Sequence, residues 1–283
     1  SSPVLKDLVI TNNTGDEGGG GGIFCYEASP TISGCIISNN TTDDVGGGLY
    51  ARNESNPTII NTKFIGNEAD LGAGCYIRSE SVPSLTGVDF NSNVAANSGG
   101  GIVLKDNADA IMDHVTMVEN IAEGLGGGIY INNADPSIDY VLISGNVSSA
   151  GGGVYVRNNS DPIFNHATVA YNTSGFEGSG IYLRDNSNLL VTNSVLWGNG
   201  NDQVYFRDSG DDVSLNISYS LVEDGQSGID VNNNGSLDWG LGMLQSEPYF
   251  CNGEGGIFSL RENSPCITAG DDGEFIGCYS VGC

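Results

Sequence analysis

The chain has 283 residues, of which 35 are acidic and 9 are Lys or Arg, and its formal net charge is −26. This excess of negative charge argues against nucleic acid or an anionic membrane surface as the general partner. No apolar run approaches the roughly 18 residues of a membrane-spanning helix, so no membrane span is expected.

Glycine-rich triplets recur along the chain and divide it into repeats. Their last glycines are Gly22, Gly48, Gly74, Gly101, Gly128, Gly153 and Gly180, at steps of 26, 26, 27, 27, 25 and 27 residues. An asparagine series from Asn13 to Asn199 runs in phase with them. A period in this range indicates a solenoid, and the leucine pattern of leucine-rich repeats is missing. We therefore predict an all-β, right-handed parallel β-helix of about eight coils over residues 1–225, followed by a C-terminal capping segment over residues 226–283.

The first segment, SPVLKDLVITNN, corresponds to the second half of a repeat, with Leu8 and Ile10 at inward positions. An uncapped coil exposes core side chains and strand edges. We expect further chain, another domain or a neighbouring subunit to cover this coil.

A strand follows each glycine triplet. Its first and third positions are apolar in every coil, as at Ile129 and Ile131, and are expected to face the core. The asparagines are expected to stack amide on amide and to satisfy buried turn groups. The glycines are expected to supply positive φ and tight turns.

The second and fourth positions of the same strands are expected to face outward, and they carry mainly tyrosines and basic side chains. The candidate binding residues on this stripe are Tyr50, Arg52, Tyr76, Arg78, Lys105, Tyr155, Arg157, Tyr182, Arg184, Tyr205 and Arg207, which include six of the nine basic residues. Two interpretations stay open. In the first, the tyrosines stack coil on coil and the basic groups pair with Asp106, Asp185 and Asp208. In the second, the stripe binds sugars that bear carboxylates or sulfates, or another protein chain.

His114 and His166 occupy the same phase two coils apart, about 10 Å from each other. That distance is too long for a shared metal ion, and both are expected to be solvated surface residues. The sequence offers no Ser/His/Asp or Cys/His set of residues that could form a nucleophilic catalytic site.

The stretch DVNNNGSLD at 230–238 is similar in spacing to a calcium loop, with Asp230, Asn232, Asn234 and Asp238 as oxygen ligands. The twelfth position of that loop is Leu241, where a bidentate carboxylate is expected. A calcium site and a plain Asx-rich turn both remain open.

The glycine triplets, together with FIGN at 64–67, ISGN at 143–146 and LWGN at 196–199, resemble repeats of secreted proteins in the pectin-lyase-like β-helix superfamily. They are also similar to the GGAI and FxxN repeats of chlamydial polymorphic outer-membrane proteins. The closing run, SLVEDG at 220–225, SEPYF at 246–250 and FSLRENSPCITAGD at 258–271, is similar to the cap of many bacterial β-helix repeat proteins. The superfamily includes polysaccharide lyases and hydrolases as well as adhesins, so the fold alone does not choose a function.

The same resemblance implies cap disulfides among Cys251, Cys266, Cys278 and Cys283, with three connectivities open, and hence an extracellular or cell-surface location. Cys25 and Cys35 both take inward phases within one coil, so a bridge between them across the core is also open. Cys75 is then left as a buried thiol.

We therefore expect a non-catalytic extracellular module for adhesion, assembly or glycan binding, with a glycan or a neighbouring protein as its partner. The alternative is a polysaccharide lyase or glycoside hydrolase that uses the stripe as a groove for acidic polysaccharide. An enzyme of that kind needs carboxylates that converge beside a base, whereas the stripe is evenly spaced.

Overall fold

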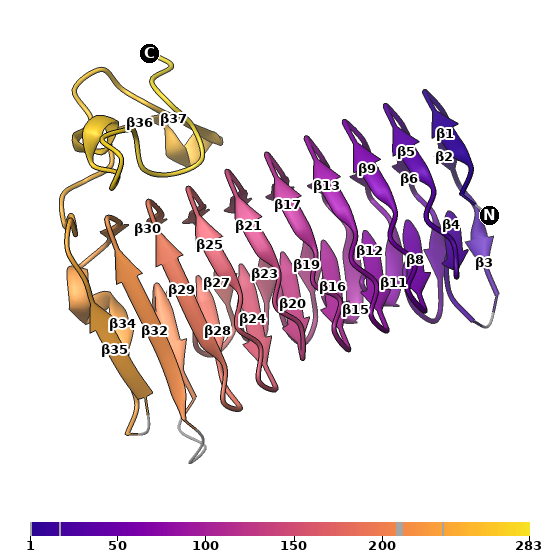
Figure 1. Cartoon of the computed structure of the whole chain (residues 1–283), viewed down its shortest axis with the longest axis horizontal. Coiled ribbons are helices and arrows are strands. Elements are labelled where there is room, and N and C mark those ends of the chain that lie inside the picture. Colours follow the sequence, from indigo (N-terminus) through magenta and orange to yellow (C-terminus); the bar gives the residue numbers. More distant parts are fainter. Residues whose placement is uncertain (1, 17, 208–211, 234) are drawn as a thin grey trace.

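A computed structural model describes residues 2–16, 18–207, 212–233 and 235–283 of the chain. The chain winds through about nine turns of a right-handed parallel β-solenoid, with the N-terminus at one end and the C-terminal segment near the other (Figure 1). The predicted fold class is therefore confirmed. In the described part of the chain, no helix is of the length and apolarity that crossing a bilayer requires.

Most coils contribute one short strand to each of four parallel sheets, and the described coils after β27 (Thr173–Ser174) have no strand in sheet C. Sheet A contains β1 (Val4–Lys6), β5 (Thr31–Ser33), β9 (Thr58–Ile60), β13 (Ser84–Thr86), β17 (Ile111–Asp113), β21 (Ser137–Asp139), β25 (Ile163–Asn165), β29 (Asn188–Thr192), β32 (Val213–Ser218) and β35 (Gly235–Trp239). Sheet B contains β2 (Val9–Thr11), β6 (Ile36–Ser38), β10 (Lys63–Ile65), β14 (Asp89–Asn91), β18 (Thr116–Val118), β22 (Leu142–Ser144), β26 (Thr168–Ala170), β30 (Val195–Trp197) and β33 (Leu221–Val222).

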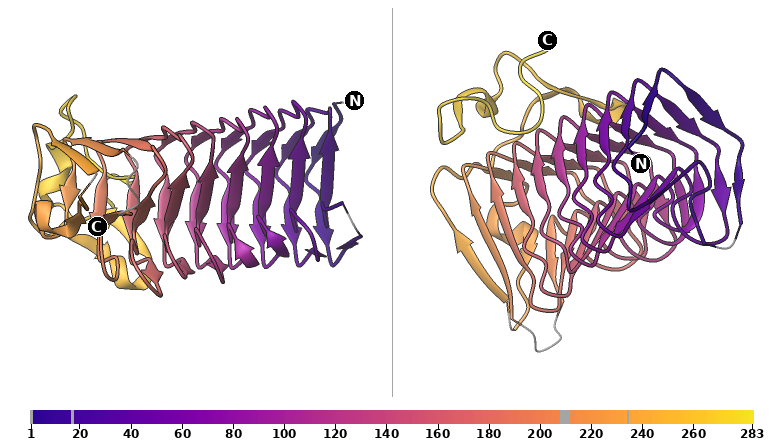
Figure 2. Two further views of the ribbon diagram at one scale, coloured as in Figure 1. Left: turned by 90° about the horizontal axis from the view of Figure 1, so that it is seen from below. Right: turned by 45° about the vertical axis from the view of Figure 1, so that its right-hand side comes forward.

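The other two sheets close the coil. Sheet C contains β3 (Thr14–Gly15), β7 (Thr41–Thr42), β11 (Glu68–Leu71), β15 (Val94–Ser98), β19 (Ile121–Ala122), β23 (Val147–Ser148) and β27 (Thr173–Ser174). Sheet D, the sheet that follows the glycine triplets, contains β4 (Ile23–Tyr26), β8 (Leu49–Arg52), β12 (Cys75–Arg78), β16 (Ile102–Lys105), β20 (Ile129–Asn132), β24 (Val154–Arg157), β28 (Ile181–Leu183), β31 (Val204–Phe206) and β34 (Ile229–Asp230). The stacking of equivalent strands is visible from two further directions in Figure 2.

Inward side chains from all four sheets fill the interior of the solenoid. Ile129 and Ile131 are fully buried, as the alternation predicts. Phe64 and Phe90 stack on neighbouring coils with ring centroids 5.0 Å apart. The core is thus a continuous column in which each coil packs on the next.

The asparagine series forms a buried ladder at the corner between sheets B and C. Asn120 Nδ2 donates to Asn146 Oδ1 at 3.0 Å and to the Phe90 carbonyl at 3.0 Å, and the same contacts recur from coil to coil. The predicted stacking of amides is confirmed.

The glycines of each triplet have different roles. The first of them, such as Gly72 with φ +61°, adopts a left-handed conformation. The last of them, such as Gly48, is needed for space, because a Cβ there would lie 2.5 Å from the Gly74 carbonyl of the next coil. Only the first glycine therefore has the positive φ that the sequence predicts for all of them.

The solenoid continues past residue 225, where its end was predicted. β34 pairs with β31, and β35 pairs with β32 over five residues, so regular coil structure reaches Trp239. The remaining segment carries β36 (Phe250–Asn252), β37 (Ile257–Leu260) and the short 3₁₀ turns η2 (Gly253–Gly255) and η3 (Pro265–Thr268), whereas η1 (Gly225–Gly228) precedes β34.

This C-terminal segment lies along the side of the solenoid (Figure 1). Phe258 and Ile276 of the segment pack on Leu142, Val195 and Leu221, which point outward from sheet B. The segment therefore covers the outer face of sheet B over the last coils. At the opposite end, Val4 and Val9 of the first coil are 69% and 66% exposed, and cover by further chain or a subunit stays a prediction.

Candidate binding site

The predicted stripe lies on the outer face of sheet D as two straight columns. The tyrosine column consists of Phe24, Tyr50, Tyr76, Val103, Tyr130, Tyr155, Tyr182 and Tyr205, which pair in strict register from β4 to β31. The basic ladder consists of Arg52, Arg78, Lys105, Arg157, Arg184 and Arg207, with Asn132 at the same position of β20. The sequence therefore placed both columns on the correct sheet and the correct side of it.

Most tyrosine rings are buried even though they point away from the core. Tyr155 is 2% exposed and Tyr76 3% exposed, because a second apolar layer covers the column. That layer comes from the residue directly before a glycine triplet, which packs on the column in four coils: Val45, Leu71, Leu125 and Ala150. The alternating pattern cannot distinguish an outward side chain in solvent from one beneath a loop.

Ring stacking fills the space between coils. Tyr130, Tyr155 and Tyr182 stack nearly parallel, with centroids 5.6 and 4.8 Å apart. Burial raises the pKa of Tyr155 and Tyr182 above the usual value for a phenol. Neighbouring rings occupy both faces of Tyr155, so a sugar cannot stack on it.

The basic groups reach the surface beside the column, and several are paired. Arg157 and Arg184 share Asp185 at 3.3 and 2.7 Å, and Arg184 Nη1 donates to the Tyr155 hydroxyl at 3.4 Å. Lys105 lies 4.0 Å from Asp106, which is a weak contact. For part of the ladder, these contacts support the first interpretation, in which the basic groups pair with neighbouring carboxylates. Asp208, the third expected partner, lies outside the described residues.

Arg52 is held differently. Its guanidinium carbon lies over the rings of Phe24, Tyr26 and Tyr50 at 5.2 to 5.5 Å. Cation–π contacts of this kind stabilise an arginine without neutralising its charge. The charge of Arg52 therefore remains available to an anionic partner.

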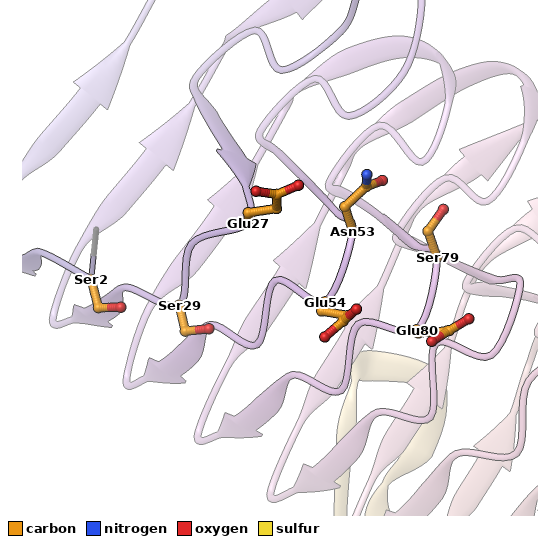
Figure 3. A pocket seen from close by; sticks show the side chains of 7 residues that line it. All are labelled: Ser2, Glu27, Ser29, Asn53, Glu54, Ser79 and Glu80. Carbon is orange, nitrogen blue, oxygen red and sulfur yellow. The ribbon is translucent and has the colours of Figure 1, made fainter.

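A hollow of about 570 Å³ lies at the turn after sheet D in the first coils (Figure 3). Its carboxylates are Glu27, Glu54 and Glu80, one from each of three successive coils, and all three are exposed. Among the described residues, no three acidic, cysteine or histidine side chains are arranged to hold a metal ion. These glutamates thus form a solvated acidic edge.

Two of the predicted calcium ligands, Asp230 and Asp238, lie in strands of different sheets. Asp230 lies in β34 of sheet D, whereas Asp238 lies in β35 of sheet A and accepts from Asn216 Nδ2 at 3.3 Å. Asn232 Nδ2 donates to the Phe206 carbonyl. Asn234 lies outside the described residues, and calcium binding stays a prediction.

The two histidines stand in one aromatic column, with Tyr140 between them. Ring centroids are 5.0 Å apart for His114 and Tyr140, and 4.5 Å apart for Tyr140 and His166. His114 is exposed, as predicted. The prediction for His166 is wrong, because Phe275 of the C-terminal segment packs 5.8 Å from its ring and leaves the residue only 4% exposed.

Among the described residues, one disulfide forms, between Cys251 and Cys283. The predicted participation of Cys266, Cys278, Cys25 and Cys35 is wrong, since all four are buried free thiols. Cys35 Sγ donates to the Ser33 carbonyl at 3.4 Å, so it points to its own turn rather than across the core to Cys25. Cys75 is a buried free thiol, as predicted.

The comparisons with known proteins agree with this architecture. A family model described as the right handed beta helix region matches residues 6–140 and 113–239. The chain belongs to this β-helix family. No curated protein and no solved structure gave a significant match. The pectin-lyase-like resemblance of the repeats is consistent with this membership.

Proposed function

We propose that this β-helix chain is a non-catalytic extracellular binding module, and that the basic ladder attaches it to an acidic glycan. The observation that carries the proposal is the alignment of six of nine basic residues in one row of an otherwise strongly acidic protein. Parallel strands repeat about every 4.8 Å, so the row offers positive charges at this interval along the solenoid, with one uncharged position at Asn132. A linear polymer with regularly spaced carboxylates or sulfates complements such a row.

The contacts of the ladder favour binding over catalysis. Arg52 lies over aromatic rings, and among the described residues Lys105, Arg157 and Arg184 each pair with a single carboxylate, that of Asp106 or Asp185. The disulfide between Cys251 and Cys283 supports an oxidising compartment. Because the tyrosine faces are covered, recognition depends on charge and hydrogen bonds from arginine and lysine.

The double substitution Arg157→Ser plus Arg184→Ser tests the proposal. We expect binding to immobilised polygalacturonate and heparin to fall by about tenfold or more, because two charge-assisted donors are lost. Lys63→Ser plus Arg261→Ser removes the same charge from sheet B and the C-terminal segment and serves as the control. Equal binding by the two variants would contradict the proposal. Release of new reducing ends from either polymer by the wild-type protein would instead support a lyase or hydrolase.

A further inference from the structure

The end of the solenoid that carries β35 is open, because the C-terminal segment packs on sheet B beside the last coils rather than across them (Figure 1). β35 is the last strand of sheet A and pairs with β32 along one edge. No strand of the described residues pairs with its other edge. An unpaired strand edge is a template for pairing with another chain.

The apolar side chains of this last coil are only partly covered. Leu237 and Trp239 are half-buried, whereas Leu215 and Ile217, at the same positions one coil earlier, are 1% and 0% exposed. Leu241, which follows β35, is 76% exposed, the highest value of any large apolar side chain among the described residues. The end of the core column is therefore accessible beside the free edge.

The free edge of β35 presents backbone groups at alternate residues. Gly240 N donates to the Ile217 carbonyl of β32, so the even-numbered positions here face β32. The N–H and C=O groups of Leu237 and Trp239 then point away from the solenoid. They can pair with an extended strand while β35 keeps its hydrogen bonds to β32.

The sequence of β35, GSLDW, complements itself when two copies run antiparallel about Leu237. Leu237 then lies opposite its own copy, and its free backbone groups make this a hydrogen-bonded pair. Asp238 lies opposite Ser236, so like charges do not meet. Trp239 lies opposite Gly235, so a large ring lies beside a residue without a side chain. A register centred on Asp238 would instead place two carboxylates opposite each other.

We infer that two copies of the chain associate end to end, with β35 of one copy pairing antiparallel with β35 of the other and joining their A sheets. The two-fold axis runs perpendicular to the joined sheet through Leu237, so both copies use the same surface. Inward side chains stay on one side of the joined sheet, so Leu237 and Trp239 of each copy cover the end of the other core. At a net charge of −26, an end-to-end contact keeps most carboxylates of the two copies apart.

Sedimentation velocity over a concentration series tests the association, and the wild-type chain is expected to show a monomer–dimer equilibrium. Ser236→Asp places a carboxylate opposite Asp238 of the other copy, twice in each dimer, and is expected to weaken dimerisation by roughly tenfold. Ser137→Asp adds the same charge to the exposed face of sheet A four coils away and is expected to leave the dimer unchanged. Both serines are exposed, and far-ultraviolet circular dichroism checks that each variant folds.

A charge exchange tests the register of the two strands. Adding Asp238→Lys to Ser236→Asp turns the repulsion into two attractive contacts, so the double variant is expected to regain at least the wild-type affinity. A wild-type chain that stays monomeric at about 200 µM, a dimer that resists Ser236→Asp, or a double variant no tighter than Ser236→Asp would overturn the inference. Assemblies longer than a dimer would point to pairing of the last coil with the first coil of another copy and would also overturn it.

The interface leaves the proposed glycan site uncovered, because the basic ladder lies on sheet D. Polygalacturonate binding by Ser236→Asp is therefore expected to match that of the wild-type chain. This measurement distinguishes failure of the end-to-end dimer from failure of glycan binding.

Discussion

Asn120 shows how one amide connects neighbouring coils. Its Oδ1 accepts from the Asn93 backbone N–H at 3.1 Å and from Asn93 Nδ2 at 2.9 Å, and its Nδ2 donates to the next coil and to the Phe90 carbonyl. The residue is fully buried, so water cannot replace these partners.

Replacement of Asn120 by Ala is expected to lower the free energy of unfolding by about 1–3 kcal/mol for each buried group left without a partner. Urea unfolding followed by circular dichroism measures the loss. Asn216→Ala, at an exposed position of β32, is the matched control and is expected to cost much less. Equal effects of the two substitutions would show that the amide ladder adds no stability.

The buried thiols predict a pattern of chemical reactivity. Burial raises the pKa of Cys25 and Cys266 to about 11 and that of Cys278 to about 12, so thiolate is scarce at neutral pH. A thiol-specific chromogenic reagent is expected to react with none of the buried cysteines at pH 7.5 in the folded protein. In denaturant it is expected to titrate the five thiols at positions 25, 35, 75, 266 and 278. A count of three would indicate a second disulfide.

Among the elements, the C-terminal segment packs on the solenoid from outside its core. Its apolar side chains pack on the outer face of sheet B. Asn193 Nδ2 donates to Asp271 Oδ1 at 3.0 Å, and the Asp271 backbone N–H donates to Asn193 Oδ1 at 3.0 Å. The Cys251–Cys283 disulfide closes a loop within the segment itself. The solenoid core does not include these contacts. Loss of the segment should therefore leave the coils intact.

Replacement of both Cys251 and Cys283 by Ser is expected to destabilise the segment by about 3–4 kcal/mol, because the loop between these cysteines, at a sequence separation of 32, is no longer closed. Hydrogen–deuterium exchange is expected to accelerate in peptides from residues 246–283 and to stay unchanged in β8, β12 and β16. Faster exchange in those central strands would show that segment and solenoid unfold as one unit.

The elements also show which parts of the molecule are predictable from sequence. The repeat period, the inward apolar positions and the asparagine ladder were predicted, because each follows from a local pattern that the coils repeat. Burial of Tyr155 under a covering loop, or of His166 under Phe275, depends on contacts between segments that no local pattern encodes. The predicted bridge between Cys25 and Cys35 was wrong for the same reason, since an inward position in the coil does not fix the direction in which either thiol points.

The molecule as a whole carries far more negative charge than its ion pairs neutralise. Four ion pairs of Lys or Arg link the described residues, against 35 acidic side chains in the sequence. Stacked coils bring equivalent acidic positions close together, as at Glu54 and Glu80 (Figure 3). Repulsion between such groups destabilises the compact state.

The melting temperature is therefore expected to rise when sodium chloride is increased from 10 to 300 mM, because the Debye length falls from about 30 Å to below 8 Å. Differential scanning calorimetry at pH 7 measures the change. The protein with Glu54→Gln plus Glu80→Gln is expected to show a smaller rise. A melting temperature that falls with salt would show that attractive pairs outweigh repulsion.

The constant register of neighbouring coils has a consequence for how the gene can change. Each strand pairs with the equivalent strand of the next coil, so addition or removal of one whole coil leaves every ladder aligned. Insertion of a single residue within a strand instead turns the following side chains to the wrong face. Duplication and unequal recombination of complete repeats thus preserve the fold, and the length of the solenoid can vary among descendants more freely than the sequence within a coil.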